Sequence, residues 1–309
     1  LIARVFEASA TFFLSDEKNK MRSAYLSAEE NFGYQAFASE HLDPASPADL
    51  KETFTMRNIL NATIAENRWP SVDFKKLMQL FFAECLERAF LLQRILAKAL
   101  NLDENFFVKF HSGENISLRL LHYPACSSDK VRDSQLGAGA HTDYGLTTFL
   151  FQDSVGGLEI CGQDGNWQDV EPDKSVVLIN SGDLLERWTN GKYRSTLHRV
   201  KPMTRGRDRF SIAFFVDPDS DTEFGLCGHW HPGGWPALEL GWSLFDGHEG
   251  KGFATEAALA VRDYSFVEMQ VDCLYSYING DNHPSIAVAR RVGGILDESA
   301  EVPGEGVLA

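Results

Sequence analysis

Short apolar runs alternate with tight turns along residues 146–216, and few folds accommodate such a pattern. Gly156-Gly157 and Asp164-Gly165 interrupt the runs, and an Asp-Gly pair is typical of a two-residue hairpin turn. The sequence predicts strands at 146–152, 158–161, 167–170, 176–180, 193–200 and 210–216. Strands this short and this closely spaced predict an antiparallel barrel or jelly roll, whose mouth can hold side chains from distant strands together.

Two histidines and one aspartate form a candidate metal site in this region. His141 and Asp143 are two positions apart, so on an extended strand their side chains project from the same face. His198 can add a third ligand from a later strand. Two histidines and one carboxylate are the facial set of non-haem Fe(II) oxygenases, which leave one side of the metal open for substrate and O2. A His-x-Asp pair taken alone more often marks a turn or a surface pair.

A second pair of side chains, Arg209 and Ser211, forms a candidate carboxylate site. Their two-residue spacing directs both to one face at the start of the predicted strand 210–216. The arginine fork can hold a carboxylate through two parallel hydrogen bonds, and a serine hydroxyl can add a third. Without the upstream metal site, a surface salt bridge would be the preferred interpretation of Arg209.

The residues from Ile116 to Asp219 resemble the 2-oxoglutarate- and Fe(II)-dependent oxygenases of the isopenicillin N synthase-like family. The motifs that carry the resemblance follow the family's order and spacing: Leu118-Arg-Leu-Leu-His-Tyr-Pro124, Gly139-Ala-His-Thr-Asp-Tyr-Gly145, Gly156-Gly-Leu158, Asn180-Ser-Gly-Asp-Leu184, Ser195-Thr-Leu-His-Arg-Val200 and Arg209-Phe-Ser-Ile-Ala-Phe-Phe215. The resemblance implies a mainly β fold with flanking helices, built on a double-stranded β-helix or jelly-roll barrel.

The resemblance also implies a set of cofactors and a reaction. The three residues of the candidate metal site would bind Fe(II), while Arg209, Ser211 and Tyr123 would hold the far carboxylate of 2-oxoglutarate. With O2, such an enzyme couples decarboxylation of 2-oxoglutarate to hydroxylation, desaturation or ring closure of a small molecule. In isopenicillin N synthase itself the Arg-x-Ser pair serves a substrate carboxylate, so the motif implies a bound carboxylate more firmly than it implies 2-oxoglutarate.

Beyond Asp219 the character of the sequence changes, and residues 225–309 predict a small α+β segment. A strand at 238–245 is followed by a glycine-rich turn, a helix through about Phe266 and a strand from Val271 to Ile278. A glycine-rich turn that opens a helix exposes backbone N–H groups at the positive end of the helix dipole, which suits a pyrophosphate. A Gly-x-Gly taken alone is often only a tight turn.

This segment resembles the GNAT acetyltransferases over about residues 228–296. Their acetyl-CoA pyrophosphate loop corresponds to Glu249, Gly250, Lys251, Gly252, Phe253 and Ala254. Glu249 stands where the family usually has Gln or Arg. Asn282 and Ser285 match an Asn-x-x-Ser pair that flanks the coenzyme, although helix capping explains the same two positions. Acetyl-CoA is therefore a second candidate cofactor, for which the sequence offers no general base.

The two resemblances divide the chain into an oxygenase domain at 1–224, with its core at 116–219, and a partial GNAT-like domain at 225–309. Both domains lack terminal elements that their families usually have. The sequence therefore predicts two partial domains, joined at Phe224 to Gly228, and truncated chain ends. Three functions remain: an oxygenase, an acetyl-CoA-dependent N-acetyltransferase, or an inactive fusion. The oxygenase is favoured because all of its metal ligands are present.

Charge and cysteine usage limit the partners and the compartment. The net charge is −15 and the pI is near 5.0, so phosphate backbones and anionic membranes repel the chain. Neither nucleic acid nor a membrane is therefore an expected partner, and no apolar run approaches the roughly 20 residues that span a bilayer. The five cysteines are odd in number and scattered, without a Cys-x-x-Cys pair, which predicts a cytoplasmic protein with free thiols.

Two helices are predicted ahead of the barrel strands. Apolar residues at helical spacing predict the first over Leu1 to Leu14 and a longer one over Phe74 to Leu100. Either Ser71 or Asp73 can cap the longer helix. Its apolar stripe predicts a scaffold helix that packs on the barrel.

The remaining segments predict no further chemistry. Residues 26–70 have mixed composition and predict a surface excursion near the pocket, with a loop at 44–47. His111 and His122 are expected to be polar or core-edge residues, because the metal site is already complete.

Overall fold

The computed structural model describes residues 1–40, 47–127, 129, 131–132, 134–173, 175–189, 191–204, 206–219, 225–231, 235–244, 248–303 and 307–309. The chain forms two compact units, residues 1–220 and 221–309. Residues 44–46 of the predicted loop lie outside the described residues, and so does Phe224 at the predicted junction. In the described part of the chain, every helix is too short or too polar to cross a bilayer.

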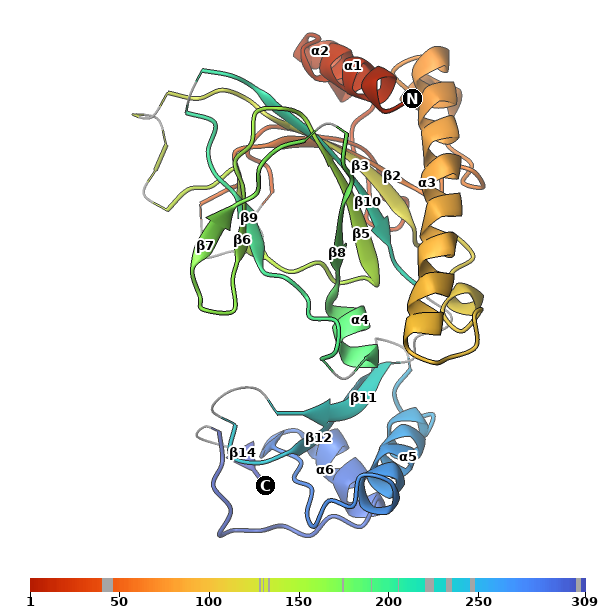
Figure 1. Ribbon diagram of the computed structural model, residues 1–309, viewed down its shortest axis with the longest axis vertical. Helices are drawn as coiled ribbons and strands as arrows, with labels where there is room; N and C mark the ends of the chain where they lie inside the picture. The colour runs from red at the N-terminus through yellow and green to blue at the C-terminus, as the bar shows by residue number, and fades with distance from the viewer. Residues whose placement is uncertain are drawn as a thin grey trace. The chain divides into compact units, whose positions relative to one another are not determined.

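The described residues of unit 1, residues 1–220, are built on two antiparallel sheets (Figure 1). The larger sheet has the spatial order β1 (Phe32–Gln35), β2 (Glu52–Arg57), β3 (Ser117–Tyr123), β10 (Arg209–Val216), β5 (Thr147–Gln152) and β8 (Leu178–Ser181). The smaller sheet has the order β4 (Ala138–His141), β9 (His198–Val200), β6 (Leu158–Cys161) and β7 (Trp167–Asp169). An apolar cluster joins the facing sides of the sheets, so the predicted jelly-roll barrel is confirmed.

The helix α3 (Val72–Ala99) covers the side of the larger sheet that faces away from the smaller one (Figure 1). The rings of Phe81 and Phe151 lie 5.2 Å apart, and those of Phe82 and Phe214 lie 5.1 Å apart. Aromatic contacts of this kind anchor the helix to β5 and β10. The predicted scaffold role of this helix is confirmed.

Both predicted helices are present. The first is α1 (Ile2–Phe13), and α3 begins after Ser71, whose Oγ accepts a hydrogen bond from the N–H of Phe74 at 3.1 Å. Ser71 rather than Asp73 is therefore the N-cap. The shorter helical elements were not predicted from the sequence; they are α2 (Glu17–Met21), η1 (Glu66–Arg68), η2 (Val108–Phe110) and α4 (Asp183–Trp188).

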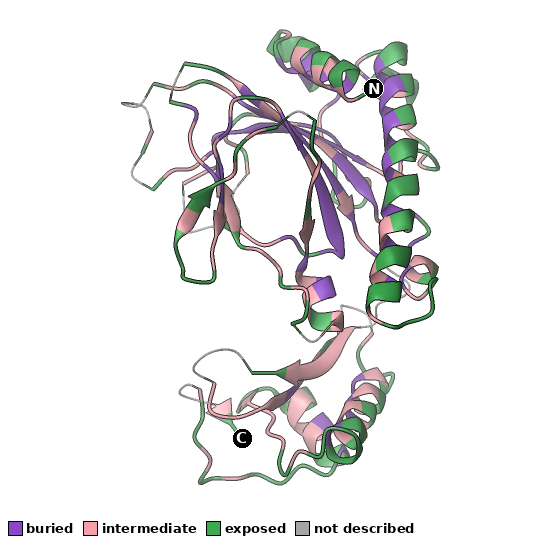
Figure 2. Cartoon of the chain, in the orientation of Figure 1, coloured by how far each residue is buried: buried purple, intermediate pink, exposed green. Residues whose placement is uncertain are grey.

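Side chains of β10 alternate between two environments. Ile212 and Phe214 belong to the core beneath the helices, whereas Ala213 belongs to the cluster between the two sheets. Most of β10 is buried, as Figure 2 shows for the centre of the larger sheet. Because the helix side supplies the packing, the inner side can carry polar groups.

The expectation of a surface excursion at residues 26–70 is wrong. This stretch contains β1 and β2, and β2 pairs with β3 along its whole length. Charged side chains of this stretch are paired in the interior. Glu52 is 3% exposed and accepts hydrogen bonds from His122 Nδ1 and Lys20 Nζ, each at 2.7 Å. Although burial opposes ionisation, these hydrogen bonds hold the pKa of Glu52 below its ordinary value.

The strand predicted at 193–200 is reduced to β9. Two side chains of the α4 region accept hydrogen bonds from the backbone ahead of it. Ser195 N–H donates to Glu186 Oε2 at 2.6 Å, and Tyr193 N–H donates to Thr189 Oγ1 at 3.1 Å. These N–H groups are therefore satisfied by side chains instead of by a neighbouring strand.

Unit 2, residues 221–309, has a small core of its own. β11 (Gly225–Trp230) pairs with β12 (Glu239–Leu244), and β13 (Ile278–Asn279) pairs with β14 (Val307–Leu308). The helices α5 (Phe253–Val267) and α6 (His283–Arg291) complete the expected α+β segment. The buried core consists of Leu240, Ala254, Ala258, Val288 and Val292.

The strand predicted from Val271 to Ile278 is wrong for most of its length. Within the described residues, Tyr275 forms one isolated bridge to Glu239, and Ile278 pairs instead with Leu308. The segment therefore pairs with β12 only at Tyr275 and with β14 at Ile278, so it forms no continuous ladder. The chain ahead of Tyr275 is largely exposed.

Replacing Phe82 by alanine tests the packing of α3 on the larger sheet. Phe82 is 1% exposed, so we expect Phe82→Ala to lower the free energy of unfolding by about 3–5 kcal/mol. Leu91 is exposed on the same helix, and Leu91→Ala should change the free energy of unfolding by less than about 0.5 kcal/mol. Urea denaturation followed by circular dichroism measures both values, and similar losses in the two variants would contradict this packing.

Candidate metal centre and active site

His141, Asp143 and His198 come together although they are distant in sequence. His141 ends β4 and His198 begins β9, and the two are paired across the strands with ring centroids 4.3 Å apart. A register shift ahead of His141 indicates a β-bulge, a feature that can redirect a side chain. Asp143 Oδ1 lies 3.8 Å from His141 Nε2 and 3.7 Å from His198 Nε2. The ligand atoms lie within 4.8 Å of one another, which leaves room for one cation at about 2 Å from each.

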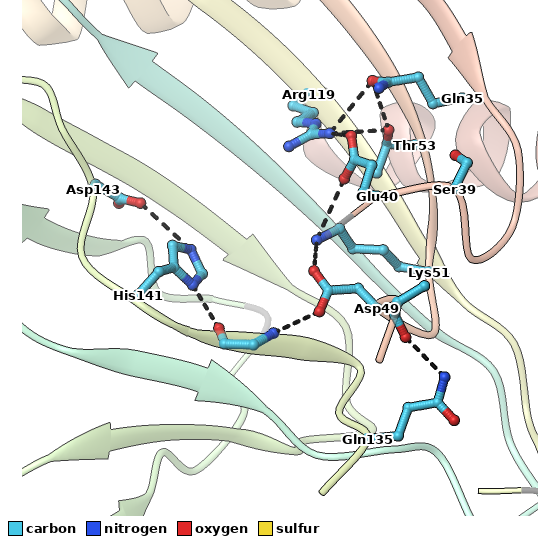
Figure 3. Close-up of polar contacts among 12 residues, drawn as sticks. Gln35, Ser39, Glu40, Asp49, Lys51, Thr53, Arg119, Gln135, His141 and Asp143 are labelled. Carbon is cyan, nitrogen blue, oxygen red and sulfur yellow. Dashed lines mark hydrogen bonds and ion pairs between the residues drawn. The ribbon is translucent and has the colours of Figure 1, made fainter. Parts of the chain in front are cut away.

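The backbone holds both imidazole rings in the same way. His141 Nδ1 donates to the carbonyl of Gly139, and His198 Nδ1 donates to that of Thr196, each at 2.8 Å. With Nδ1 as the donor, a neutral ring carries its lone pair on Nε2, and Figure 3 shows the His141 ring between its backbone acceptor and Asp143. Burial, and then the proximity of His198, lower the pKa of His141, which favours the neutral ring that a metal requires.

Asp143 is buried, and the segment that ends β8 fixes its position. Asn180 Nδ2 donates to Asp143 Oδ2 at 2.7 Å, while Asp183 N–H donates to the Asp143 carbonyl at 2.8 Å. Gly182 permits this close approach, because a Cβ there would lie 2.1 Å from the carbonyl oxygen of Gly145. Asn180 therefore orients the carboxylate. Asn180 belongs to one of the family motifs, but the sequence alone did not predict this role.

Arg209, Ser211 and Tyr123 also lie together, on the inner face of the larger sheet. Arg209 is opposite Tyr123 in the strand register, and its Cζ lies 4.7 Å from the centre of the tyrosine ring. Arg209 Nη1 donates to Ser211 Oγ at 3.2 Å, and Nη2 donates to Oε1 of Gln152 on β5 at 2.8 Å. Gln152 was not predicted as a site residue, although it is a polar residue that ends the apolar run at 146–152.

The guanidinium of Arg209 is buried with unused hydrogen-bonding capacity. Arg209 is 1% exposed, and within the described residues its Nε–H has no acceptor. Burial of an unpaired cation is costly, so a site of this kind favours an anionic ligand. A carboxylate fits the donor set, because the planar fork and the Ser211 hydroxyl can each bind an oxygen.

The other two histidines that the sequence analysis considered have structural contacts. His111 is buried, its Nδ1 donates to the carbonyl of Phe107 at 2.8 Å, and burial lowers its pKa. His122 contacts Glu52 and stacks on Phe210 with ring centroids 4.6 Å apart. Both therefore have the polar core roles that were expected.

In unit 2, the glycine-rich loop opens a helix as predicted. Gly250 and Gly252 have φ angles of +73° and +91°, and Gly252 directly precedes α5. Ala254 packs in the core of the unit. Ser285 N–H donates to Asn282 Oδ1 at 3.2 Å, and Asn282 is the N-cap of α6. Helix capping therefore accounts for Asn282 and Ser285, and coenzyme binding by this loop stays a prediction.

Two protein families match the chain. The family model of the 2OG-Fe(II) oxygenase superfamily matches residues 114–218. A second family model, the acetyltransferase (GNAT) domain, matches residues 175–295. Residues 175–218 fall within both matches, and in the structure they contribute β8, β9 and β10 to the sheets of unit 1. The GNAT match therefore begins within the barrel, ahead of the residues at 228–296 that carried the predicted resemblance.

Individual relatives agree with the oxygenase match. A 2-oxoglutarate-Fe(II) type oxidoreductase of Emericella nidulans is 31% identical over 237 residues, which cover 72% of this chain and 68% of the relative. A proline hydroxylase of Petromyces alliaceus is 32% identical over 237 residues, which cover 72% and 74% of the two chains. A full-length Neurospora crassa protein, solved in complex with alpha-KG, has a TM-score of 0.62 and 35% identity, over 70% of this chain and 71% of that one. This chain therefore belongs to the 2OG-Fe(II) oxygenase superfamily.

Proposed function

We propose that this protein is a 2-oxoglutarate-dependent Fe(II) dioxygenase that oxidises a small molecule with O2, and that His141, Asp143 and His198 bind its iron. The strongest support is the approach of both Nε2 atoms to one oxygen of a buried carboxylate. Two imidazoles and one carboxylate on the same side of a cation would leave the opposite side open, as Fe(II) oxygenases require.

We also propose that Arg209, Ser211 and Tyr123 hold the distal carboxylate of 2-oxoglutarate. The free Nε–H of Arg209 supplies a donor, and Gln152 keeps the guanidinium in one orientation. Because the fork is already oriented, little side-chain entropy is lost when the carboxylate binds. The ring of Tyr123 covers one face of the guanidinium and excludes water from it.

The residues of this chain bind, orient and shield the reacting groups. Fe(II) and 2-oxoglutarate supply the oxidising chemistry when they are bound. Leu121, Leu150 and Ala213 lie on the same inner face as Arg209 and Ser211 and form part of the apolar cluster between the sheets. This apolar lining limits water near the site.

Relatives support a small organic substrate. Structures of the Neurospora crassa protein contain thymine or 5-formyluracil together with alpha-KG, and the Petromyces alliaceus relative is a proline hydroxylase. We propose a substrate of comparable size for this protein. We further propose a cytoplasmic location, because the cysteines are scattered and odd in number.

Removal of the proposed carboxylate ligand should abolish the metal site. Loss of a hydrogen bond that supports a metal ligand weakens metal binding by about 10- to 100-fold. We expect Asp143→Ala, which removes a ligand itself, to weaken Fe(II) binding by more than this. Anaerobic addition of Fe(II) and 2-oxoglutarate measures binding through the weak visible charge-transfer band of the chelate. Asp164→Ala, in an exposed turn, is the control and should keep the band. A band of equal strength in Asp143→Ala would refute the assignment.

Gln152→Leu should weaken 2-oxoglutarate binding without affecting the metal. The change removes the acceptor of Arg209 Nη2, and a hydrogen bond to a charged group contributes about 1.5–3 kcal/mol. The Kd for 2-oxoglutarate should therefore rise about 10- to 100-fold in a titration of metal-loaded protein. Gln168→Leu makes the same substitution at an exposed strand position and should leave the Kd unchanged. If Gln152→Leu behaves like this control, Gln152 does not support the arginine.

Acetyl-CoA binding by unit 2 is a second candidate function, favoured by the GNAT match and the left-handed glycines of the loop. If the loop binds the coenzyme, calorimetric titration should give saturable heat in the wild type. Gly252→Val should diminish it, because a β-branched residue is strained at a φ of +91°. Absence of heat from the wild-type protein would contradict this candidate.

A further inference from the structure

The segment at residues 48–51, just ahead of β2, ties the larger sheet to the strand that carries His141. Leu50 N–H donates to the Leu136 carbonyl at 2.9 Å, and Gly139 N–H donates to Asp49 Oδ1 at 2.8 Å. Gly139 lies in β4 of the smaller sheet, whereas β2 pairs with β3 in the larger one. The segment therefore bridges the two sheets beside the candidate metal site.

Asp49 is connected to His141 through Gly139 (Figure 3). Asp49 Oδ1 accepts the Gly139 N–H, and the Gly139 carbonyl accepts the Nδ1–H of His141, each at 2.8 Å. The two backbone groups flank one Cα, so restraint of the first limits movement of the second. Glycine has the most backbone freedom of any residue, which makes an external restraint more important here. The carbonyl in turn sets the direction in which His141 Nε2 points.

Asp49 is itself fixed by a buried ion pair with Lys51. The two residues are 3% and 4% exposed, and Lys51 Nζ lies 2.5 Å from Asp49 Oδ2 and 3.4 Å from Glu40 Oε2. A buried ion pair is a poor source of stability, because desolvation offsets much of its attraction. What this pair supplies is orientation. Lys51 occupies one oxygen of Asp49 and Gly139 N–H occupies the other, so the carboxylate is held against rotation.

The network extends to the inner face of the larger sheet and balances its charges. Glu40 also pairs with Arg119, whose Nη2 lies 3.1 Å from Thr53 Oγ1 (Figure 3). Lys51 and Arg119 are the cations of this network, and Asp49 and Glu40 are its carboxylates. Removal of one charge would leave another poorly compensated in the interior.

We propose that Asp49, oriented by Lys51, is a positioning residue for the metal site. The Asp49 carboxylate bonds to Gly139 N–H and to Lys51. By holding Gly139 in place, it sets the direction of the lone pair on His141 Nε2. The inference rests on the proposed function, because it requires His141 to be a metal ligand. Metal affinity should therefore depend on a hydrogen-bond acceptor at position 49.

Two double variants of equal charge distinguish the effect of the hydrogen-bond acceptor at position 49 from the effect of the ion pair. Asp49→Asn with Lys51→Met keeps an oxygen for the Gly139 N–H, whereas Asp49→Leu with Lys51→Met fills a similar volume without an acceptor. Mn(II), followed by electron paramagnetic resonance on the full chain, reports metal affinity without turnover. We expect the Asn variant to bind Mn(II) within about 3-fold of wild type and the Leu variant to bind it about 10- to 100-fold more weakly.

The controls distinguish positioning from general stability. Glu30→Gln breaks the ion pair with Arg68 elsewhere in unit 1 and should leave Mn(II) affinity unchanged. Urea denaturation of each variant shows whether it is folded, and Asp49→Ala with Lys51→Met replaces the Leu variant if that variant does not fold. Equal Mn(II) affinity in the acceptor and non-acceptor variants overturns the proposal.

His141→Ala separates this result from the proposed function. If His141→Ala keeps wild-type Mn(II) affinity, the ligand assignment itself fails. If His141→Ala loses affinity while the two double variants bind Mn(II) equally, His141 remains the ligand and the role of Asp49 is refuted.

Discussion

Successive side chains of a strand point to opposite faces of the sheet, so in this barrel core side chains and site side chains lie on different faces. In β10, Ile212 and Phe214 pack beneath the helices, while Arg209 and Ser211 face the opposite sheet. A guanidinium that is 1% exposed is tolerable there because hydrogen bonds to Ser211 and Gln152 compensate part of its desolvation. Alternation thus lets one strand support the core and a functional site together.

The candidate metal site requires both sheets of the barrel. His141 and His198 belong to the smaller sheet, whereas Asp143 is oriented by Asn180, which lies in β8 of the larger sheet. The geometry of the site is therefore a product of sheet packing. Substitutions far from the metal can alter it by shifting one sheet against the other.

Features that depend on residues close together in the sequence could be predicted from the sequence alone. The spacing of His141 and Asp143 correctly predicted that both side chains could bind one ion, although β4 ends at His141 and Asp143 lies beyond the strand. The short runs at 146–216 located most barrel strands. The strands β1 and β2 were missed because they are short and lie in a stretch of mixed composition, and because Glu52 of β2 resembles a surface residue until its partners on other elements are known. Gln152 was missed for a related reason, since its role depends on Arg209 on the adjacent strand. Contacts between elements were thus the information that local patterns lacked.

Lys51 and Glu52 are neighbours in the sequence, yet their charges are neutralised on opposite faces of one sheet. Lys51 pairs with Asp49 on the inner side, whereas Glu52 pairs with Lys20 on the helix side. A one-residue slip of β2 along β3 would turn the Glu52 carboxylate away from Lys20 and toward the inner side, where Glu40 already lies. The buried ion pair of Glu52 therefore disfavours this alternative alignment of the strands.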